Sequence, residues 1–172
     1  MNTRTITKMA LLVALCGIAA FLSFPLPLVP GMVTALTIVF CLIGLMLPPK
    51  EAFITLCLYV LLGAIGLPVY TGGASGMAKL FGPTGGFIWS FPIAYTLLSI
   101  FKGPNKVLSY FIRATIITIP ITHLMGMAGG MIYSNLSFMQ AFWSFSAPFI
   151  PLDIVKCFIA AWIAVAMKRA GI

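Results

Sequence analysis

Residues 32–66 read MVTALTIVFCLIGLMLPPKEAFITLCLYVLLGAIG, and this stretch decides the fold. It holds two apolar runs that only the short sequence PPKE separates. Each run approaches the roughly 20 mostly apolar residues that a membrane-spanning helix needs. Neither run has the polar face that a helix on the surface of a soluble protein carries. The stretch therefore predicts two spanning helices, at about 32–47 and 51–66, joined by a tight turn.

The composition of the whole chain is that of a membrane protein. Of its 172 residues, 62% are hydrophobic and 7% are charged, whereas a soluble domain has roughly 25% charged residues. Ten Lys and Arg against two acids give a net charge of +8. These basic residues are scattered singly between apolar segments, so we expect no nucleic-acid partner. The four cysteines form no C-x-x-C pair and support neither a disulfide framework nor a zinc site.

Clusters of proline, glycine and charge divide the rest of the chain in the same way. The prediction is a single transmembrane domain with helices at about 7–24, 32–47, 51–66, 83–101, 107–130 and 151–169. The first helix should end at the cluster Pro25, Pro27, Pro30 and Gly31, because repeated prolines remove backbone donors. Its basic, apolar start also fits a signal peptide, but no small-x-small cleavage site precedes a soluble domain.

The distribution of basic residues predicts the orientation. One side of the membrane receives Arg4, Lys8, Lys50, Lys102, Lys106, Lys168 and Arg169. The other side receives only Lys79, which lies in the Gly-rich loop 67–82. By the positive-inside rule both termini are then cytoplasmic. The Gly-rich loop and the start of the last helix lie on the outer face, where an imported substrate would arrive.

The two acidic residues have different interpretations. Glu51 lies in the first turn of its helix, where the helix dipole favours a carboxylate by roughly 0.3 to 1 kcal/mol. Asp153 lies in PFIPLDIVK with Lys156 three residues later on the same helix face. The pair is either an ion pair at a helix start or part of a ligand site. We favour the ligand site, because ionisable groups near membrane depth are costly and are usually functional.

The remaining polar residues give weaker signals. We interpret Arg113 as a packing residue, and His123, the one histidine, as an interhelical hydrogen-bonding residue rather than a ligand. The Gly-rich loop, with Tyr70 and Ser75, could close over a small polar ligand, but it lacks the spacing of a P-loop. One histidine and two acids provide no catalytic set, so we do not expect an enzyme.

Two segments resemble the BioY family, the biotin-specific S components of energy-coupling factor (ECF) transporters. They are LPVYTGGASGMAKLFGPTGGFIWSF, at 67–91, and APFIPLDIVK, at 147–156. The resemblance extends over nearly the whole chain, and GPTGG together with P-x-D-x-x-K is its most specific part. It implies an all-α integral membrane protein with a six-helix, S-component-like bundle in the bacterial cytoplasmic membrane. Such a protein captures biotin from outside and needs no cofactor of its own.

The resemblance also implies partners. S components dock onto a shared transmembrane T component with two ATPase subunits, and those partners hydrolyse ATP. An alanine-spaced face on the first helix meets the T component in this family, which assigns Ala10 and Ala14 to docking. Two alternatives stay open, namely an S component for another vitamin and a stand-alone secondary carrier.

The chemistry of biotin suggests roles for the site residues. Its ureido ring has two N–H donors and one carbonyl, and its tail ends in a carboxylate. An ionised Asp accepts N–H bonds and a Lys attracts an oxygen acceptor. We assign Asp153 to the ureido end, with Lys156 on the ureido carbonyl or the carboxylate, and Lys79 as an extra cation for the carboxylate. The lid would consist of Tyr70, Gly72, Gly73 and Ser75, and the apolar walls of Phe87, Trp89 and Phe149.

Overall fold

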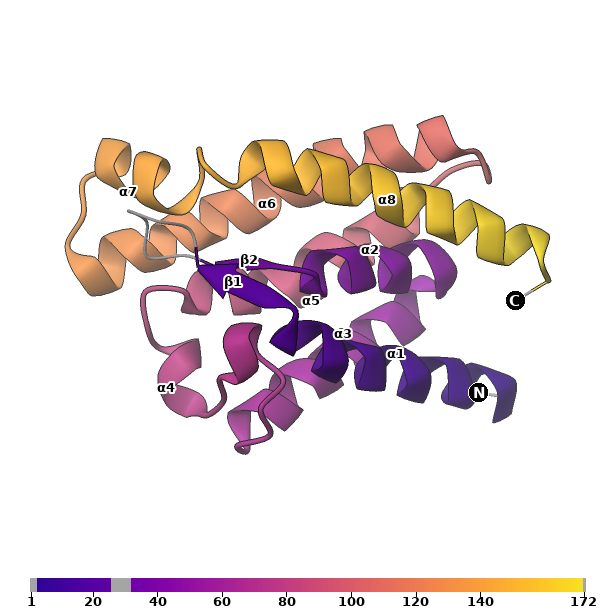
Figure 1. The fold of residues 1–172 in the computed structure, drawn as a ribbon, viewed down its shortest axis with the longest axis horizontal. Coiled ribbons are helices and arrows are strands. Elements are labelled where there is room, and N and C mark those ends of the chain that lie inside the picture. The colour runs from indigo at the N-terminus through magenta and orange to yellow at the C-terminus, as the bar shows by residue number, and fades with distance from the viewer. Residues whose placement is uncertain (1–2, 26–31, 172) are drawn as a thin grey trace.

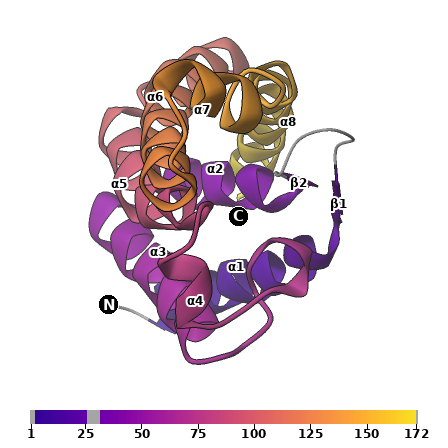
Figure 2. The same cartoon turned by 90° about the vertical axis from the view of Figure 1, so that its left-hand side faces the viewer.

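The computed structural model describes residues 3–25 and 32–171, and most of them are helical. The elements in chain order are α1 (Thr3–Phe21), β1 (Ser23–Pro25), β2 (Met32–Thr34), α2 (Leu36–Met46), α3 (Pro49–Ala64), the 3₁₀ turn η1 (Thr71–Gly73), α4 (Met77–Leu80), α5 (Gly85–Phe101), α6 (Val107–Ser134), α7 (Phe138–Phe145) and α8 (Ile150–Arg169). Figure 1 shows the long helices running roughly side by side, and Figure 2 looks along them.

Three helices of the described chain, α1, α6 and α8, are long and apolar enough to cross a membrane. Helices α2 and α5 are also apolar but shorter. Large apolar side chains stand exposed on the outside of the bundle, among them Leu58, Trp143 and Trp162. A water-soluble protein rarely leaves so much large apolar surface uncovered. This outer surface is therefore suited to contact with lipid rather than with water.

The core forms around α2, whose Phe40 is completely buried. The Phe40 ring lies 5.0 Å from that of Tyr59, 4.5 Å from that of Phe91 and 5.5 Å from that of Tyr95, measured between centroids. Aromatic pairs at such distances and inclined angles add stabilisation beyond the apolar area that they bury. This aromatic cluster joins α2, α3 and α5.

Glycine lets α5 and α6 approach closely. A Cβ atom at Gly86 would collide with the backbone of Met125, and one at Gly126 would collide with the ring of Phe87. Small residues allow such backbone contact between membrane helices, where van der Waals packing drives association. The GPTGG sequence thus ends in a packing contact that fixes the start of α5 against α6.

Helix α1 begins and helix α8 ends at the same end of the molecule (Figure 1), where basic residues make several contacts. We call this the basic end. There Arg4 Nη2 donates to the Gly171 carbonyl at 2.9 Å and Lys168 Nζ donates to Tyr110 Oη at 2.6 Å. Lys102 Nζ donates to the Leu47 carbonyl at 2.8 Å. Burial, and after it the charge of Lys168, lowers the pKa of Lys102 to about 8. The β-hairpin, α4 and α7 occupy the opposite end.

The predicted helix boundaries need correction at this opposite end. The helix predicted at 7–24 spans Thr3–Phe21, and residues Ser23–Pro25 pair as an antiparallel strand with Met32–Thr34, where the next helix was expected to begin. The N–H groups at the start of a helix have no partner within the helix. Just before α2, the Ala35 N–H finds a partner outside it, because it donates to the Leu22 carbonyl at the base of the hairpin. Pro27, Pro30 and Gly31 of the predicted helix stop lie outside the described residues.

Several other boundaries also differ from the prediction, by up to four residues. Helix α3 begins at Pro49 rather than Glu51, because proline is well suited to the first helical turn. Helix α6 continues to Ser134, four residues beyond the prediction, and ends at Asn135 in the left-handed conformation. The segment predicted to be interfacial contains α7, which a Ser137–Gln140 capping box begins. The Gly-rich loop contains the single helical turn α4.

Candidate ligand-binding site

A cavity of about 170 Å³ lies toward the end opposite the basic end. Its walls come from β2, from helices α2 to α8 and from the Gly-rich loop, so most of the chain contributes to it. The lining residues are Met32, Thr34, Thr37, Tyr59, Tyr70, Thr71, Ala74, Lys79, Thr84, Phe87, Ile88, Phe91, Thr122, Phe145, Phe149, Asp153 and Lys156. The mixture of aromatic walls with a few polar groups is typical of a small-molecule site.

The charged wall of the cavity is Asp153 with Lys156, both in the first two turns of α8. Lys156 Nζ donates to Asp153 Oδ1 at 2.8 Å, as the spacing of three residues predicted. Their side chains are 17% and 12% exposed, so both charges are largely removed from water. Charges that are partly buried interact more strongly than exposed pairs, and removing one leaves the other uncompensated.

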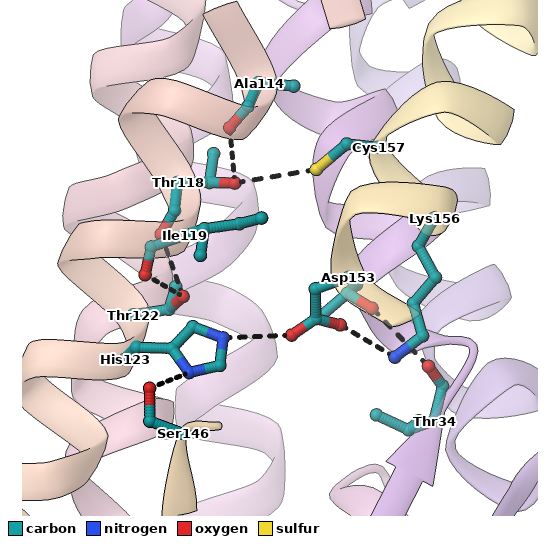
Figure 3. A network of polar contacts seen from close by, with 11 residues as sticks. Thr34, Ala114, Thr118, Ile119, Thr122, His123, Ser146, Asp153, Lys156 and Cys157 are labelled. Atoms are coloured by element: carbon teal, nitrogen blue, oxygen red, sulfur yellow. Dashed lines mark hydrogen bonds and ion pairs between the residues drawn. The ribbon is translucent and has the colours of Figure 1, made fainter. Parts of the chain in front are cut away.

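A second partner holds the other carboxylate oxygen (Figure 3). His123 Nε2, from α6, lies 3.1 Å from Asp153 Oδ2, and His123 Nδ1 lies 3.0 Å from Ser146 Oγ. The prediction that His123 bonds between helices is confirmed. Its partner is thirty positions away in sequence, which is why no carboxylate near His123 in the chain indicated the contact.

The Gly-rich loop contributes one wall of the cavity, and its Tyr70 is attached to α3. The Tyr70 hydroxyl donates to the Val60 carbonyl at 2.7 Å, and burial raises the pKa of Tyr70 to about 12, which keeps this donor protonated. Gly63 makes room for the Tyr70 ring, since a Cβ there would collide with it. Gly72 and Gly73 both have φ of +72°, a conformation that glycine adopts without strain. The loop is thus built to hold Tyr70 in the cavity wall.

Lys79 provides a second cation at the cavity. It extends from α4, which lies across the molecule from α8 in both ribbon views (Figures 1 and 2). No ion pair joins Lys79 to a carboxylate in the described part of the chain, whereas Lys156 is paired with Asp153. The cavity therefore has a neutralised ion pair on one wall and an uncompensated positive charge on another.

The structure brings together some predicted site residues and separates others. Those that line the cavity are Asp153, Lys156, Tyr70, Lys79, Phe87 and Phe149. The backbone of Gly72, Gly73 and Ser75 shapes the loop without lining the cavity. Trp89 is 46% exposed and its Nε1 donates to the Leu80 carbonyl at 3.1 Å, so its placement in the wall is wrong. The residues of α5 that point into the cavity are its neighbours Phe87, Ile88 and Phe91.

Several lining residues carry no signal in the sequence. Thr34 belongs to β2 and Thr37 to α2. Phe145 belongs to α7, which was expected to lie at the membrane interface. Tyr59 and Thr122 sit inside apolar helices where any polar residue could equally be packing. Only a knowledge of which helix faces meet could have selected these positions.

The remaining singled-out residues have structural contacts. Arg113 Nη1 donates to the Phe101 carbonyl at 2.7 Å, as expected for a packing residue. Glu51 lies in the first turn of α3. Ala10 and Ala14 are exposed on one face of α1, so nothing in the described chain covers them.

Fold and site together define a helical membrane protein that encloses a small-molecule site between its helices near one end. The chain belongs to the BioY family, whose model matches residues 1–171. It is 36% identical to the biotin transporter BioY2 of Lactococcus lactis subsp. cremoris, over 98% of this chain and 93% of that protein. It is 31% identical to the biotin transporter BioY of Rhizobium etli, over 94% and 91% of the two chains.

The fold has a counterpart among solved structures. The crystal structure of the S-component for biotin from an ECF-type ABC transporter superposes on this chain with a TM-score of 0.88. The match covers 98% of this chain and 95% of that one at 25% sequence identity. The helical arrangement is therefore that of an S component.

Proposed function

We propose that this protein binds biotin in the cavity and takes it up as the S component of an ECF-type ABC transporter. Membership of the BioY family and relatives named as biotin transporters support the proposal. The observation that carries it is the largely buried Asp153–Lys156 pair at the cavity wall. Such a pair presents hydrogen-bond acceptors and donors to one planar polar ring, which is what the ureido group of biotin requires.

The two cation positions suggest how biotin lies in the site. Asp153 accepts from one ureido N–H group, and Lys156 donates to the ureido carbonyl beside it. The carboxylate goes to Lys79, because that cation has no acidic partner among the described residues whereas Lys156 has one. Aromatic side chains, Phe87, Phe91 and Phe149 among them, line the space for the thioether ring. Of the two roles that the sequence left open for Lys156, this proposal favours the ureido carbonyl.

The proposal includes six membrane spans with both termini in the cytoplasm. The basic end then lies on the cytoplasmic side, in agreement with the positive-inside rule. The cavity and the Gly-rich loop lie toward the outside. Helices α2, α3 and α5 are shorter than a full membrane span. At the outer end, the hairpin, the Gly-rich loop and α7 fill the remaining thickness of the bilayer. The membrane is the bacterial cytoplasmic membrane.

Energy for uptake comes from partners in this proposal. A transmembrane T component and two ATPase subunits bind the S component and hydrolyse ATP. The exposed Ala10 and Ala14 of α1 provide a face of small side chains on which a helix of the T component can pack closely. The chain itself acts as a binding and transport subunit and not as an enzyme.

Uptake measurements test this assignment against a stand-alone carrier. Cells without a biotin transporter of their own are supplied with this chain alone or together with a T component and two ATPases. We expect radiolabelled biotin uptake that requires the ATPases and disappears when the Walker A lysine of each ATPase is replaced. Uptake by the chain alone that collapses with an uncoupler would instead identify a secondary carrier.

A further inference from the structure

His123 occupies an unusual position for the one histidine of the chain. Its side chain is 5% exposed, and both ring nitrogens have a partner, Ser146 at the end of α7 and Asp153 in α8. Phe87 packs against the ring edge-on, with centroids 6.0 Å apart. The neighbouring Thr122 hydroxyl bonds to carbonyls of its own helix and does not compete for His123. Two hydrogen bonds and one aromatic contact therefore fix the position of the imidazole ring.

The proton positions follow from the partners. An ionised carboxylate can only accept hydrogen bonds, so Nε2 must carry a hydrogen to bond Asp153. In a neutral ring Nδ1 is then an acceptor, and the Ser146 hydroxyl must donate to it. The chain of contacts runs from Ser146 through His123 to Asp153 and on to Lys156 (Figure 3). The Asp153 carboxylate makes His123 Nε2 a donor, and in the neutral ring this makes Nδ1 the acceptor of the Ser146 hydroxyl.

We propose that His123, as the neutral Nε2–H tautomer that its bond to Asp153 requires, is a positioning residue that orients Asp153 for the ureido ring. This inference rests on the proposed function, because it deepens the role of the same site. His123 takes one carboxylate oxygen and Lys156 takes the other. With both oxygens held, the carboxylate cannot rotate, and a remaining lone pair stays directed at a ureido N–H group.

Holding Asp153 from two sides also has an energetic consequence. Without His123 the carboxylate can turn toward Lys156 and satisfy itself there, which removes an acceptor from the ligand. A site whose polar groups are already oriented binds more tightly, because binding does not have to order them. The loss should therefore appear in ligand affinity even where the folded structure persists.

Glutamine and asparagine at position 123 form a matched pair for the test. The amide nitrogen of glutamine can reach the position of Nε2 and donate to Asp153, whereas the shorter asparagine amide reaches only toward Nδ1 and Ser146. We expect His123→Gln to bind biotin within about threefold of the unmodified protein and His123→Asn to bind about tenfold or more weakly. Titration calorimetry measures the affinities, and thermal unfolding of both variants reports stability separately.

The Asp153→Asn background isolates the route by which His123 acts. If His123 acts through the carboxylate, His123→Asn should have little further effect on affinity once that carboxylate is absent. A purely structural role would instead lower affinity equally in both backgrounds and in proportion to the loss of thermal stability. Equal affinities of the Gln and Asn variants, or equal effects in the two backgrounds, would overturn the proposal.

Nitrogen-15 NMR of the imidazole provides a test that needs no ligand. With a single histidine in the sequence, an untagged protein labelled at histidine has one pair of ring resonances. We expect a protonated Nε2 and an unprotonated Nδ1, and loss of this preference in Asp153→Ala, which removes the acceptor that requires it. A ring protonated at Nδ1 alone or at both nitrogens contradicts the proposal. If the unmodified protein shows the expected tautomer but no affinity for biotin, the proposed function fails and the orientation role for biotin fails with it, while the hydrogen-bonded chain stands.

Discussion

The polar wall of the cavity belongs to a chain of four side chains, Ser146, His123, Asp153 and Lys156. Asp153 and Lys156 are three positions apart on one helix, so their contact follows from helix geometry alone. His123 and Ser146 could not be found in this way, because their contact with the site depends on how α6, α7 and α8 pack. Trp89 was assigned to the wall by residue type, and the helix face that it occupies places it outside.

Replacing Asp153 by asparagine tests the acceptor role. The change preserves shape, removes the charge and leaves Lys156 without its partner. Losing one hydrogen bond to a charged group weakens binding by roughly 1.5 to 3 kcal/mol, or about ten- to hundredfold in Kd. Calorimetric titration of purified protein with biotin measures the change. Glu51→Gln, which removes the other acid far from the cavity lining, is the control and should bind normally. An unchanged affinity in Asp153→Asn contradicts the assignment.

Lys79 is tested by changing both protein and ligand. We expect Lys79→Ala to weaken biotin binding about tenfold and to have little effect on biotinamide, which lacks the carboxylate charge. The unmodified protein should then prefer biotin to biotinamide, and the variant should lose that preference. Lys50→Ala provides a control for removing a positive charge at the other end. A variant that still discriminates between the two ligands would place the carboxylate elsewhere.

At the level of elements, the apolar runs predicted each long helix, and the elements that were missed lie at the end opposite the basic end. Length and hydropathy report where a chain can be helical in lipid, and the C-terminal ends of α5 and α8 agree with the prediction. The β-hairpin was missed because its strands have three residues each, too few for a period to be recognised. The loop conformation was missed because it depends on Tyr70 reaching back to α3.

Gly63→Ala tests how that loop is held. A methyl group at this position collides with the Tyr70 ring, and the loop must move to relieve the contact. We expect a lower melting temperature and weaker biotin binding, by about tenfold if the Tyr70 wall is displaced. Gly17→Ala is the matched control, since its Cβ would meet only Val69 at an ordinary 3.8 Å. Normal binding and stability in Gly63→Ala would show that Tyr70 is not fixed by this contact.

At the scale of the whole molecule, the structure separates a ligand end from a basic end. The cavity lies among the loops of one end, and Arg4, Lys102 and Lys168 gather at the other. Between them α1 presents Ala10 and Ala14 to the outside. The proposed binding and docking surfaces are thus different, and it should be possible to impair one without the other.

Ala14→Trp tests this separation. A large side chain on the exposed face of α1 should block close approach of a partner helix. We expect the isolated variant to bind biotin normally, while its co-purification with the T component and its uptake activity fall at least about tenfold. Ile116→Trp, at an exposed position on α6, is the control for bulk on the lipid-facing surface. Full uptake by Ala14→Trp would move the docking surface away from this face.

The central claim is that the cavity recognises biotin, and isothermal titration of the purified, detergent-solubilised protein tests it most directly. Biotin is titrated alongside thiamine and riboflavin. We expect tight, saturable binding of biotin and no heat of binding from the other two vitamins. A folded sample that leaves biotin unbound, or that binds thiamine or riboflavin instead, would contradict the account and assign the same fold to another ligand.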